Sequence, residues 1–254
     1  MNKTVRFGDR EVARMGLGTN RLTQTPANVE LLSHAAAASV GLIDTAHLYT
    51  GGASESTIGA AFDGRTPRPF VATKGGFGRG EGRPEVLRSQ IEESLRRLRF
   101  DRIDLYYLHR VDPETPLEDS VGTLAEYRQR GVIEHIGLSQ VGIDQIERAR
   151  QVVPITAVQN HYNIDERGWD DVVSYCEREG IVFVPFYPLH GDRPELRDIA
   201  RRHDATPSQI ALAWLLRRSP VMLPIPGTLS VEHMLENVAA LDIELTDDEF
   251  AALS

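Results

Sequence analysis

Short apolar segments recur along the whole chain, and each is followed by a stretch with the periodicity of an amphipathic helix. Eight such segments begin near Met15, Gly41, Phe70, Ile103, Ile133, Ile155, Ile181 and Val221. Their mean spacing of about 29 residues is the size of one strand–helix unit. Val- and Ile-rich strands that alternate with helices favour a parallel sheet covered by helices. Eight units predict closure into an α/β fold of the (β/α)8 TIM-barrel type, with an open doubly wound sheet as the alternative.

Local signals place the ends of several elements. One face of the segment 84–98 carries apolar residues at helical spacing, namely Leu87, Ile91, Leu95 and Leu98. The run Thr206-Pro-Ser-Gln predicts a capped helix start, and we expect Thr115 and Thr246 to begin helices in the same way, the last being a short C-terminal helix. Residues 4–7 and 11–14 flank Gly8-Asp9 and predict an N-terminal β-hairpin on the barrel floor. No linker divides the chain, so we expect one domain over residues 1–254.

The composition is that of a globular protein with an acidic balance. The 254 residues include 28 Lys and Arg against 37 Asp and Glu, a formal net charge of −9 at pH 7. This balance argues against nucleic-acid and anionic-membrane binding, which need clustered positive charge. Cys176 is the only cysteine, so no intrachain disulfide is expected. The polar N-terminus and the short apolar runs predict a cytoplasmic protein without a membrane span.

Polar side chains follow five consecutive predicted strands. In a parallel barrel the functional face is the carboxyl end of the strands. The residues at these ends are, in order, Asp44, Thr73 and Lys74, His109 and Arg110, Ser139 and Gln140, and Gln159 and Asn160. A single polar strand end is usually a solvated loop, whereas five in series indicate a site at one mouth of the barrel.

Four of the residues near this mouth make chemical sense together. A free phenol such as that of Tyr49 is a poor acid at neutral pH, and the ammonium group of Lys74 would stabilise its phenolate. Asp44 can pair with Lys74, and His109 can hydrogen-bond a carbonyl oxygen or relay a proton. The set would donate a proton to a carbonyl oxygen as hydride reaches the carbon. On spacing alone, a structural Asp–Lys ion pair beside a half-buried Tyr remains the alternative.

A series of motifs between Gly16 and Leu253 resembles the aldo-keto reductase family. In chain order they are GLIDTAHLYTGGASESTIGAAF, FVATKGGF, LYYLHR, IEHIGLSQV, AVQNHYNI, VPFYPL and IPGTLSVEHMLENVAAL. The resemblance implies a (β/α)8 barrel that reduces aldehydes or ketones with NAD(P)H. It implies Tyr49 as general acid, Lys74 and Asp44 as the groups that support it, and His109 as the residue that orients the substrate. The last two motifs are most similar to short bacterial and plant members, which include pyridoxal reductases.

The chain carries no complete GxGxxG fingerprint, and the resemblance implies another way of holding the dinucleotide. Ser139, Gln140 and Gln159 would bind the nicotinamide carboxamide, and Phe186 would stack on its ring. A helix is predicted to begin near Val231, where its N-terminus suits a phosphate. The implied cofactor-binding residues are Gly18, Thr19, Asn20, Asp44, Ser139, Gln140, Gln159, Phe186, Tyr187, Pro188, Leu189, Gly191, Gly227, Thr228, Leu229, His233, Glu236 and Asn237.

Two departures from the family pattern bear on the choice of cofactor. Gly227 stands where larger members carry Lys, and His233 stands where they carry Arg. Both changes remove fixed positive charge, which weakens the case for NADP(H) without favouring NAD(H). We expect NADP(H) in preference to NAD(H), because His233, Thr228 and Ser230 can still bind a 2′-phosphate.

The residues implied to bind the substrate predict an open and polar pocket. They are Asn20, Leu48, Tyr49, Gly76, His109 and Arg110. Asn20, Gly76 and Arg110 stand where reductases of apolar aldehydes often carry bulky aromatics. We therefore expect a small polar carbonyl substrate, and Arg110 allows an anionic one. Positive potential for such ligands would come from Lys74, His109, Arg110 and His233.

Two further functional readings are weaker. A cofactor-binding, redox-sensing regulatory subunit with slow turnover would carry the same four residues. A metal-dependent barrel enzyme would need clustered ligands, but the eight His are scattered without an HxH or HExxH motif, so we expect no metal site. The motifs are compatible with a monomer or a weak homo-oligomer.

Overall fold

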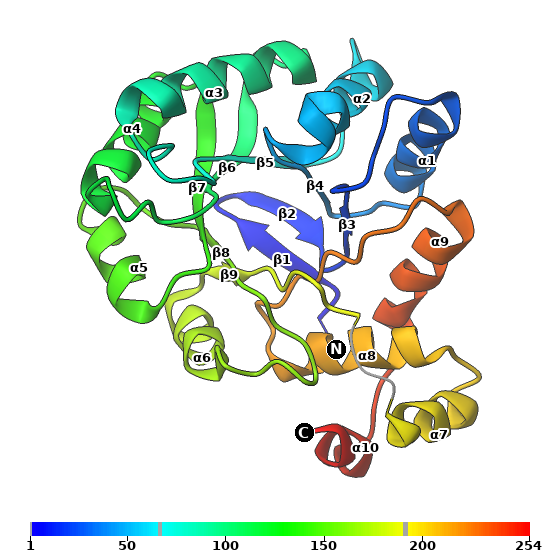
Figure 1. The fold of residues 1–254 in the computed structure, drawn as a ribbon. Coiled ribbons are helices and arrows are strands. Elements are labelled where there is room, and N and C mark those ends of the chain that lie inside the picture. The colour runs from blue at the N-terminus through cyan, green and yellow to red at the C-terminus, as the bar shows by residue number, and fades with distance from the viewer. Residues whose placement is uncertain (1, 66–67, 190–192) are drawn as a thin grey trace.

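The computed structural model describes residues 2–65, 68–189 and 193–254 (Figure 1). The strands are β1 (Thr4–Phe7), β2 (Arg10–Ala13), β3 (Gly16–Gly18), β4 (Leu42–Asp44), β5 (Val71–Gly75), β6 (Ile103–Leu108), β7 (Ile133–Ser139), β8 (Ala157–Gln159) and β9 (Val182–Phe183). The α-helices are α1 (Pro26–Ala37), α2 (Ala53–Phe62), α3 (Pro84–Leu98), α4 (Leu117–Gln129), α5 (Ile143–Arg150), α6 (Asp170–Glu179), α7 (Pro194–Arg202), α8 (Pro207–Arg218), α9 (Val231–Ala239) and α10 (Asp247–Leu253). Two 3₁₀ helices complete the set, η1 (Tyr49–Gly52) and η2 (Ala240–Asp242).

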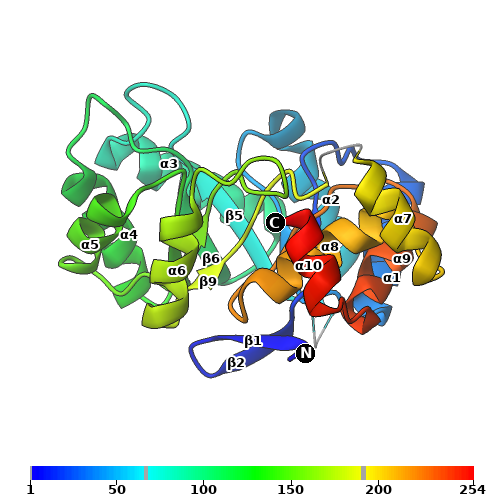
Figure 2. The same ribbon diagram turned by 90° about the horizontal axis from the view of Figure 1, so that it is seen from below.

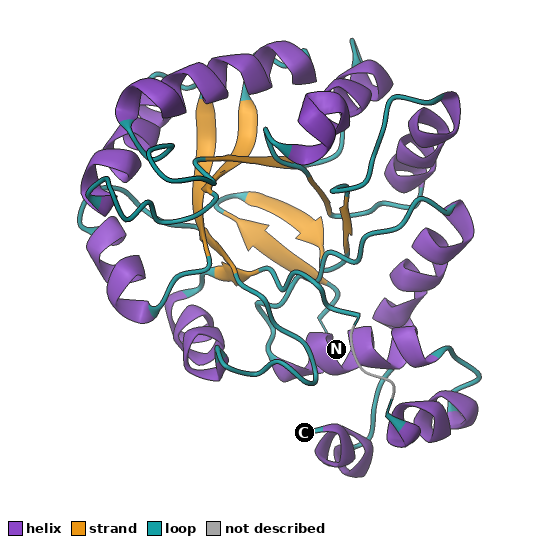
Figure 3. Cartoon of the chain, viewed as in Figure 1, coloured by secondary structure: helices purple, strands orange, loops and turns teal. Residues whose placement is uncertain are grey.

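A parallel sheet curls around the centre of the molecule, and helices surround it (Figure 3). The sheet has seven strands in the order β3-β4-β5-β6-β7-β8-β9, so neighbours in the sequence are neighbours in space. Each strand is followed by helix, as the alternating pattern predicts. No helix in the described ranges is long and apolar enough to cross a membrane.

The eighth predicted strand, near Val221, is not a regular strand. Within the described chain, this run makes only isolated bridges, Phe183 to Met222 and Gly18 to Gly227. Its carbonyls at Pro224 and Pro226 accept hydrogen bonds from the N–H groups of Gly16 and Gly18, at 2.9 and 3.1 Å. Pro224 and Pro226 have no N–H group to donate to a neighbouring strand, so the regular series of backbone hydrogen bonds is interrupted here. The run therefore closes the curled sheet between β9 and β3 without being a strand itself.

The N-terminal hairpin is confirmed, with its second strand beginning at Arg10 instead of residue 11. β1 and β2 pair antiparallel and lie across one end of the barrel (Figure 2). Phe7 of β1 is fully buried and stacks on Phe70, with ring centroids 4.7 Å apart. The hairpin thus covers the floor of the barrel.

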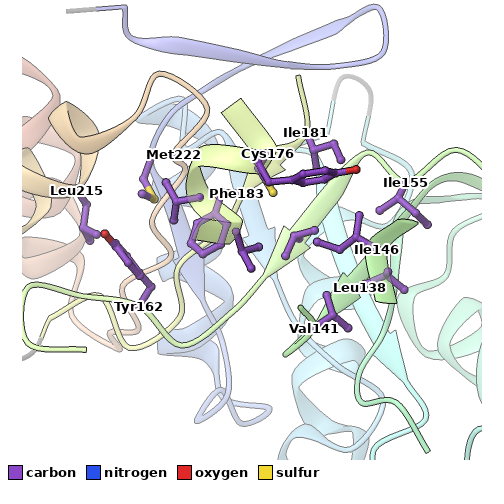
Figure 4. Close-up of a cluster of buried hydrophobic side chains, with 14 of the residues drawn as sticks. Leu138, Val141, Ile146, Ile155, Tyr162, Cys176, Ile181, Phe183, Leu215 and Met222 are labelled. Atoms are coloured by element: carbon purple, nitrogen blue, oxygen red, sulfur yellow. The ribbon is translucent and has the colours of Figure 1, made fainter. Parts of the chain in front are cut away.

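Apolar side chains fill the space inside the sheet and the space between the sheet and its helices. Figure 4 shows part of the outer layer, to which Leu138, Phe183 and Cys176 of α6 belong. Burial raises the pKa of the Cys176 thiol to about 12, so this cysteine behaves as a small apolar residue. The predicted apolar face of α3 is confirmed, with Leu87 and Ile91 fully buried.

Two of the three predicted helix starts have the expected caps. Thr206 and Thr246 each accept a hydrogen bond from the backbone three residues on, and each is completed by a capping-box side chain. The prediction for Thr115 is wrong, because α4 begins at Leu117 with no side-chain cap on Pro116. The Thr115 hydroxyl donates instead to Asp112, at 2.7 Å.

Candidate active site

The structure brings the polar strand ends together at the mouth opposite the hairpin. Asp44 ends β4, Lys74 lies in β5, His109 directly follows β6, Ser139 ends β7, and Gln159 ends β8. Parallel register sets this convergence, because Asp44 pairs with Ala72 of β5 and Ser139 pairs with Gln159. The carboxyl ends of the strands therefore present these side chains to one cavity.

Lys74 is the centre of the hydrogen-bond network. Its ammonium group donates to Asp44 Oδ1 at 2.5 Å, to the Thr45 carbonyl at 2.7 Å and to the Tyr49 hydroxyl at 3.3 Å. The second oxygen of Asp44 accepts from Gln159 Nε2 at 2.8 Å. Burial alone would lower the pKa of Lys74, but the opposite charges of Asp44 and Tyr49 outweigh it and raise that pKa. Lys74 is therefore a fixed cation with one N–H aimed at Tyr49.

A left-handed turn directly follows Tyr49. Tyr49 begins η1, and the next residues, Thr50, Gly51 and Gly52, all have positive φ, of 49°, 63° and 89°. The two glycines adopt this conformation without steric cost, whereas Thr50 is strained in it. The Thr50 hydroxyl donates to the Leu22 carbonyl at 2.7 Å and holds the turn against the loop after β3.

His109 stands on the other side of Tyr49. The two rings meet edge to face, with centroids 5.9 Å apart. Burial lowers the pKa of His109 to about 2, and the charges of Lys74 and Arg110 add to the effect. The imidazole is therefore neutral at physiological pH. The expectation that His109 adds positive potential is wrong, although its neutral ring can still donate a hydrogen bond.

Arg110 crosses the mouth beside His109. Its Nη1 donates to the His109 carbonyl at 2.6 Å and to Ser139 Oγ at 3.1 Å. The guanidinium lies over the rings of Phe77 and Phe186, at 5.3 and 5.9 Å from the centroids. Phe186 also stacks on His161, with centroids 5.4 Å apart. Aromatic and cationic groups thus frame the entrance.

A cavity of about 690 Å³ joins these groups. Its lining comprises Gly18, Thr19, Asn20, Arg21, Asp44, Leu48, Tyr49, Phe77, His109, Arg110, Ser139, Gln159, Phe186, Tyr187, Pro188, Leu189, Ile225, Pro226 and Gly227. Lys74 lies beneath the lining and reaches it through Tyr49 and Asp44. The volume is that of a site for a small molecule or part of a larger cofactor.

Several residues predicted from the sequence lie outside this lining. They are Gly76, Gln140, Thr228, Leu229, His233, Glu236 and Asn237. The Gln140 side chain accepts from the His161 backbone at 2.7 Å, and the Gly76 N–H donates to Gln90. Gly191 and the neighbouring His190 lie outside the described residues. No group of three or more His, Cys, Asp or Glu in the described part of the chain is placed to hold a metal ion.

After Gly227, the last lining residue in chain order, the chain continues into α9. Ser230 caps this helix, and its hydroxyl accepts from the His233 N–H at 3.2 Å. The Ser230 N–H donates in turn to Thr228 Oγ1 at 3.0 Å. This arrangement occupies two backbone donors near the N-terminus of α9. His233 itself is exposed on the first turn.

Two lining residues that carry chemistry were not predicted from the sequence. Arg21 lines the cavity and donates to the Gly227 carbonyl at 3.1 Å, so it supplies positive charge where Gly227 lacks it. One sequence signal could have identified Arg21, namely its position directly after Asn20, at the end of the first predicted strand. Phe77 also lines the cavity and meets the His109 ring edge to face, at 4.9 Å between centroids. Its loop is the glycine-rich run after β5.

The fold and the cavity define an α/β-barrel protein whose candidate site lies at the carboxyl ends of the strands, as in barrel enzymes. The sequence profile of the Aldo/keto reductase family matches residues 14–193 and 191–254. The chain therefore belongs to the aldo/keto reductase family, and this membership makes it an oxidoreductase.

Relatives and solved structures match over nearly the full chain. An uncharacterised oxidoreductase of Schizosaccharomyces pombe is 39% identical, over 98% of this chain and 88% of the relative. Pyridoxine 4-dehydrogenase of Escherichia coli is 34% identical, over 99% of this chain and 97% of the relative. A crystal structure of an aldo-keto reductase from Klebsiella pneumoniae in complex with NADPH is 27% identical, with a TM-score of 0.89 over 100% of this chain and 94% of that chain.

Proposed function

We propose that this protein reduces the carbonyl group of a small polar aldehyde or ketone to the alcohol, with NADPH as the reductant. The observation that carries the proposal is the Lys74 ammonium group, fully buried and bonded to both Asp44 and the Tyr49 hydroxyl. A buried cation fixed against a phenol at the wall of a cavity is the arrangement that proton transfer to a carbonyl oxygen requires.

Tyr49 is the proton donor in this proposal. Its hydroxyl lines the cavity, and Lys74 lies 3.3 Å behind it. When the proton leaves, Lys74 stabilises the phenolate, and Asp44 keeps Lys74 in place without itself reaching Tyr49. Because these groups are ordered before the substrate arrives, little reorganisation is needed during the reaction.

His109 orients the carbonyl oxygen. Its Nδ1 is buried and has no hydrogen-bond partner among the described residues. A buried N–H without an acceptor is costlier than an unused lone pair, so the proton of the neutral ring belongs on Nε2. From Nε2 the ring donates to the carbonyl oxygen next to Tyr49, and the two donors then hold the oxygen between them.

The cavity has groups that fit a nicotinamide dinucleotide. Ser139 and Gln159 place a hydroxyl and an amide at one end, where a carboxamide can be bound, and the half-buried ring of Phe186 offers an apolar face. Arg21 offers a cation for a phosphate near Gly227. When bound, NADPH supplies the hydride. The NADPH complex of the Klebsiella pneumoniae relative supports this assignment.

His233 is proposed to favour NADPH over NADH by contacting the 2′-phosphate. We expect His233→Ala to raise the dissociation constant of NADPH by about 10-fold, the value of one charge-assisted hydrogen bond. The dissociation constant of NADH should change less than twofold. Equilibrium fluorescence titrations of both cofactors on both proteins measure this, and an equal change for the two cofactors contradicts the assignment.

Tyr49→Phe tests the reaction itself. The wild-type protein should oxidise NADPH with 4-nitrobenzaldehyde, and pyridoxal belongs in the same panel because one relative is a pyridoxine 4-dehydrogenase. Tyr49→Phe should lower kcat by about 100-fold or more, since it removes the proton donor but keeps the ring. Cofactor binding by fluorescence titration is the control and should be retained. A variant that turns over at the wild-type rate removes Tyr49 from the mechanism, and slow turnover by the wild type favours the regulatory alternative.

A further inference from the structure

Arg110 is a cation at the cavity wall that forms no ion pair with an acidic side chain of the described residues. Both of its hydrogen bonds use Nη1, to the His109 carbonyl and to Ser139 Oγ. No carboxylate of the described residues lies within ion-pair distance of its guanidinium. In a chain with 37 Asp and Glu against 28 Lys and Arg, an unpaired arginine in a functional cavity requires a reason.

The surroundings of Arg110 hold the guanidinium in place. The rings of Phe77 and Phe186 both lie within 6 Å of it, and Ser139 Oγ fixes one nitrogen. The side chain is half-buried, so an anion bound there is partly shielded from water. Nε and Nη2 form the edge of the guanidinium that makes no hydrogen bond within the described chain. Such an edge matches the two oxygens of a carboxylate.

We propose that Arg110 binds a carboxylate carried by the substrate, so that the preferred substrates are aldehydes or ketones bearing an acid group. This inference rests on the proposed carbonyl reduction at the same site. Arg110 lines the same cavity as Tyr49 and directly follows His109 in the chain, so one molecule can place its carbonyl at those two residues and its carboxylate on Arg110.

An alternative role for the charge of Arg110 is to stabilise the Tyr49 phenolate, and the experiment must distinguish it from carboxylate binding. Arg110 is close enough to Tyr49 for the charge on the phenolate to act on the guanidinium. If its purpose were to stabilise that phenolate, it would accelerate the reduction of every carbonyl equally. Lys74 already stabilises that phenolate, with its ammonium nitrogen 3.3 Å from the Tyr49 oxygen. A carboxylate site, in contrast, changes the preference between charged and neutral substrates.

The experiment compares two aldehydes of the same shape, 4-carboxybenzaldehyde and the neutral 4-nitrobenzaldehyde. The measured quantity is the ratio of their kcat/KM values with saturating NADPH. Arg110→Met should lower this ratio between about 10- and 100-fold, because the carboxylate loses a charge-assisted bidentate partner. Arg110→Lys should lower it less, since the charge remains while the planar edge is lost. Repeating the assay with 2- and 3-carboxybenzaldehyde shows the separation of carbonyl and carboxylate that the cavity accepts.

Arg79→Met is the matched control. Arg79 lies in the loop after β5, is exposed, pairs with Glu114 and does not line the cavity, yet its loss changes the net charge by the same amount. The ratio of kcat/KM values for the two aldehydes should be the same in Arg79→Met as in the wild type. A ratio unchanged in Arg110→Met, or lowered equally in Arg79→Met, overturns the inference while leaving carbonyl reduction intact. Absence of NADPH oxidation with every aldehyde would instead overturn the proposed function.

Discussion

At the scale of single residues, the site holds two neighbouring basic residues in different charge states, Lys74 charged and His109 neutral. Lys74 lies in β5 and His109 directly follows the adjacent strand β6, and both side chains are largely enclosed. Lys74 stays charged because Asp44 and Tyr49 outweigh its burial, whereas His109 has no acidic partner in the described structure and its pKa is lowered to about 2. The first residue therefore stabilises negative charge, and the second donates a hydrogen bond as a neutral ring.

The pKa of His109 predicts a specific dependence of stability on pH. The unfolded chain binds a proton at His109 below about pH 6.5, and the folded chain does not until about pH 2. Protonation therefore favours unfolding, and stability falls as pH drops below 6.5. Between pH 7.5 and 5.0 the wild type should lose about 2 kcal/mol more than His109→Gln. Urea unfolding of both proteins at both pH values measures the difference, and equal losses would show that His109 is protonated in the folded state.

Residues at strand ends could be predicted from the sequence, because the alternation of strands and helices places the carboxyl ends of the parallel strands at one mouth of the barrel. Asp44, Lys74 and His109 were predicted in this way and lie together in the structure. Arg21 and Phe77 were not predicted, since their place in the cavity depends on the paths of two loops. The neutral state of His109 was also beyond the sequence, because it depends on how much protein surrounds the ring.

At the scale of elements, the short helix η1 positions Tyr49, the proposed proton donor, after the end of β4. After β4 the chain reaches Tyr49, whose hydroxyl accepts from Lys74, and the left-handed turn begins at the next residue, Thr50. The strain at Thr50 is held by its bond to the Leu22 carbonyl and by the bond that Ser54 N–H donates to its hydroxyl, at 3.0 Å. Thr50 does not line the cavity and is thus a positioning residue.

Substitution of Thr50 tests this positioning. Thr50→Ala removes the hydroxyl but keeps the strain, so the turn relaxes and Tyr49 moves from Lys74. We expect kcat to fall about 10-fold, in line with the sensitivity of proton transfer to small displacements. The dissociation constant of NADPH should stay within twofold. Thr50→Ser keeps the hydroxyl and should restore kcat, and a failure of this rescue would assign the loss to something other than the hydrogen bonds of this hydroxyl.

The elements also show where sequence signals compete. Thr206 and Thr115 stand in similar Thr-Pro contexts, but only Thr206 has a Gln three residues on whose side chain returns to the cap. Thr115 has Asp112 within reach and bonds to it instead. In the same way, the apolar run at Val221 has the composition of a strand, yet Pro224 and Pro226 remove the donors that a strand needs.

At the scale of the whole molecule, the acidic chain keeps positive charge at the mouth. Arg21 and Arg110 line the cavity, and Lys74 lies just beneath it. Asp44 balances Lys74, so the two arginines provide the positive potential that an anionic ligand meets. The net charge of −9 thus disfavours polyanions over the rest of the surface without opposing a small anion at this mouth.

One buried arginine bonds to several segments where the barrel closes. Arg14 is fully buried and donates to the carbonyls of Asn2, Leu216, Ser219 and Met222, at 2.5 to 2.9 Å. It therefore joins the segment after the hairpin to the end of α8 and to the irregular closing run. Burial lowers the pKa of Arg14 to about 10, which still leaves it charged at pH 7.

Arg14→Met should destabilise the protein by about 3 kcal/mol. Methionine fills much of the volume, but it leaves buried carbonyls without a donor where prolines already limit the ladder. Arg6→Met is the control, because Arg6 lies on the hairpin that precedes Arg14, is exposed, and bonds at the surface to the Glu11 side chain and the Asp9 carbonyl, so its loss should cost less than about 1 kcal/mol. Urea unfolding at pH 7.5 measures both. If the two substitutions cost the same, the closing run does not depend on Arg14, and the isolated bridges to β3 and β9 are sufficient to hold the barrel closed.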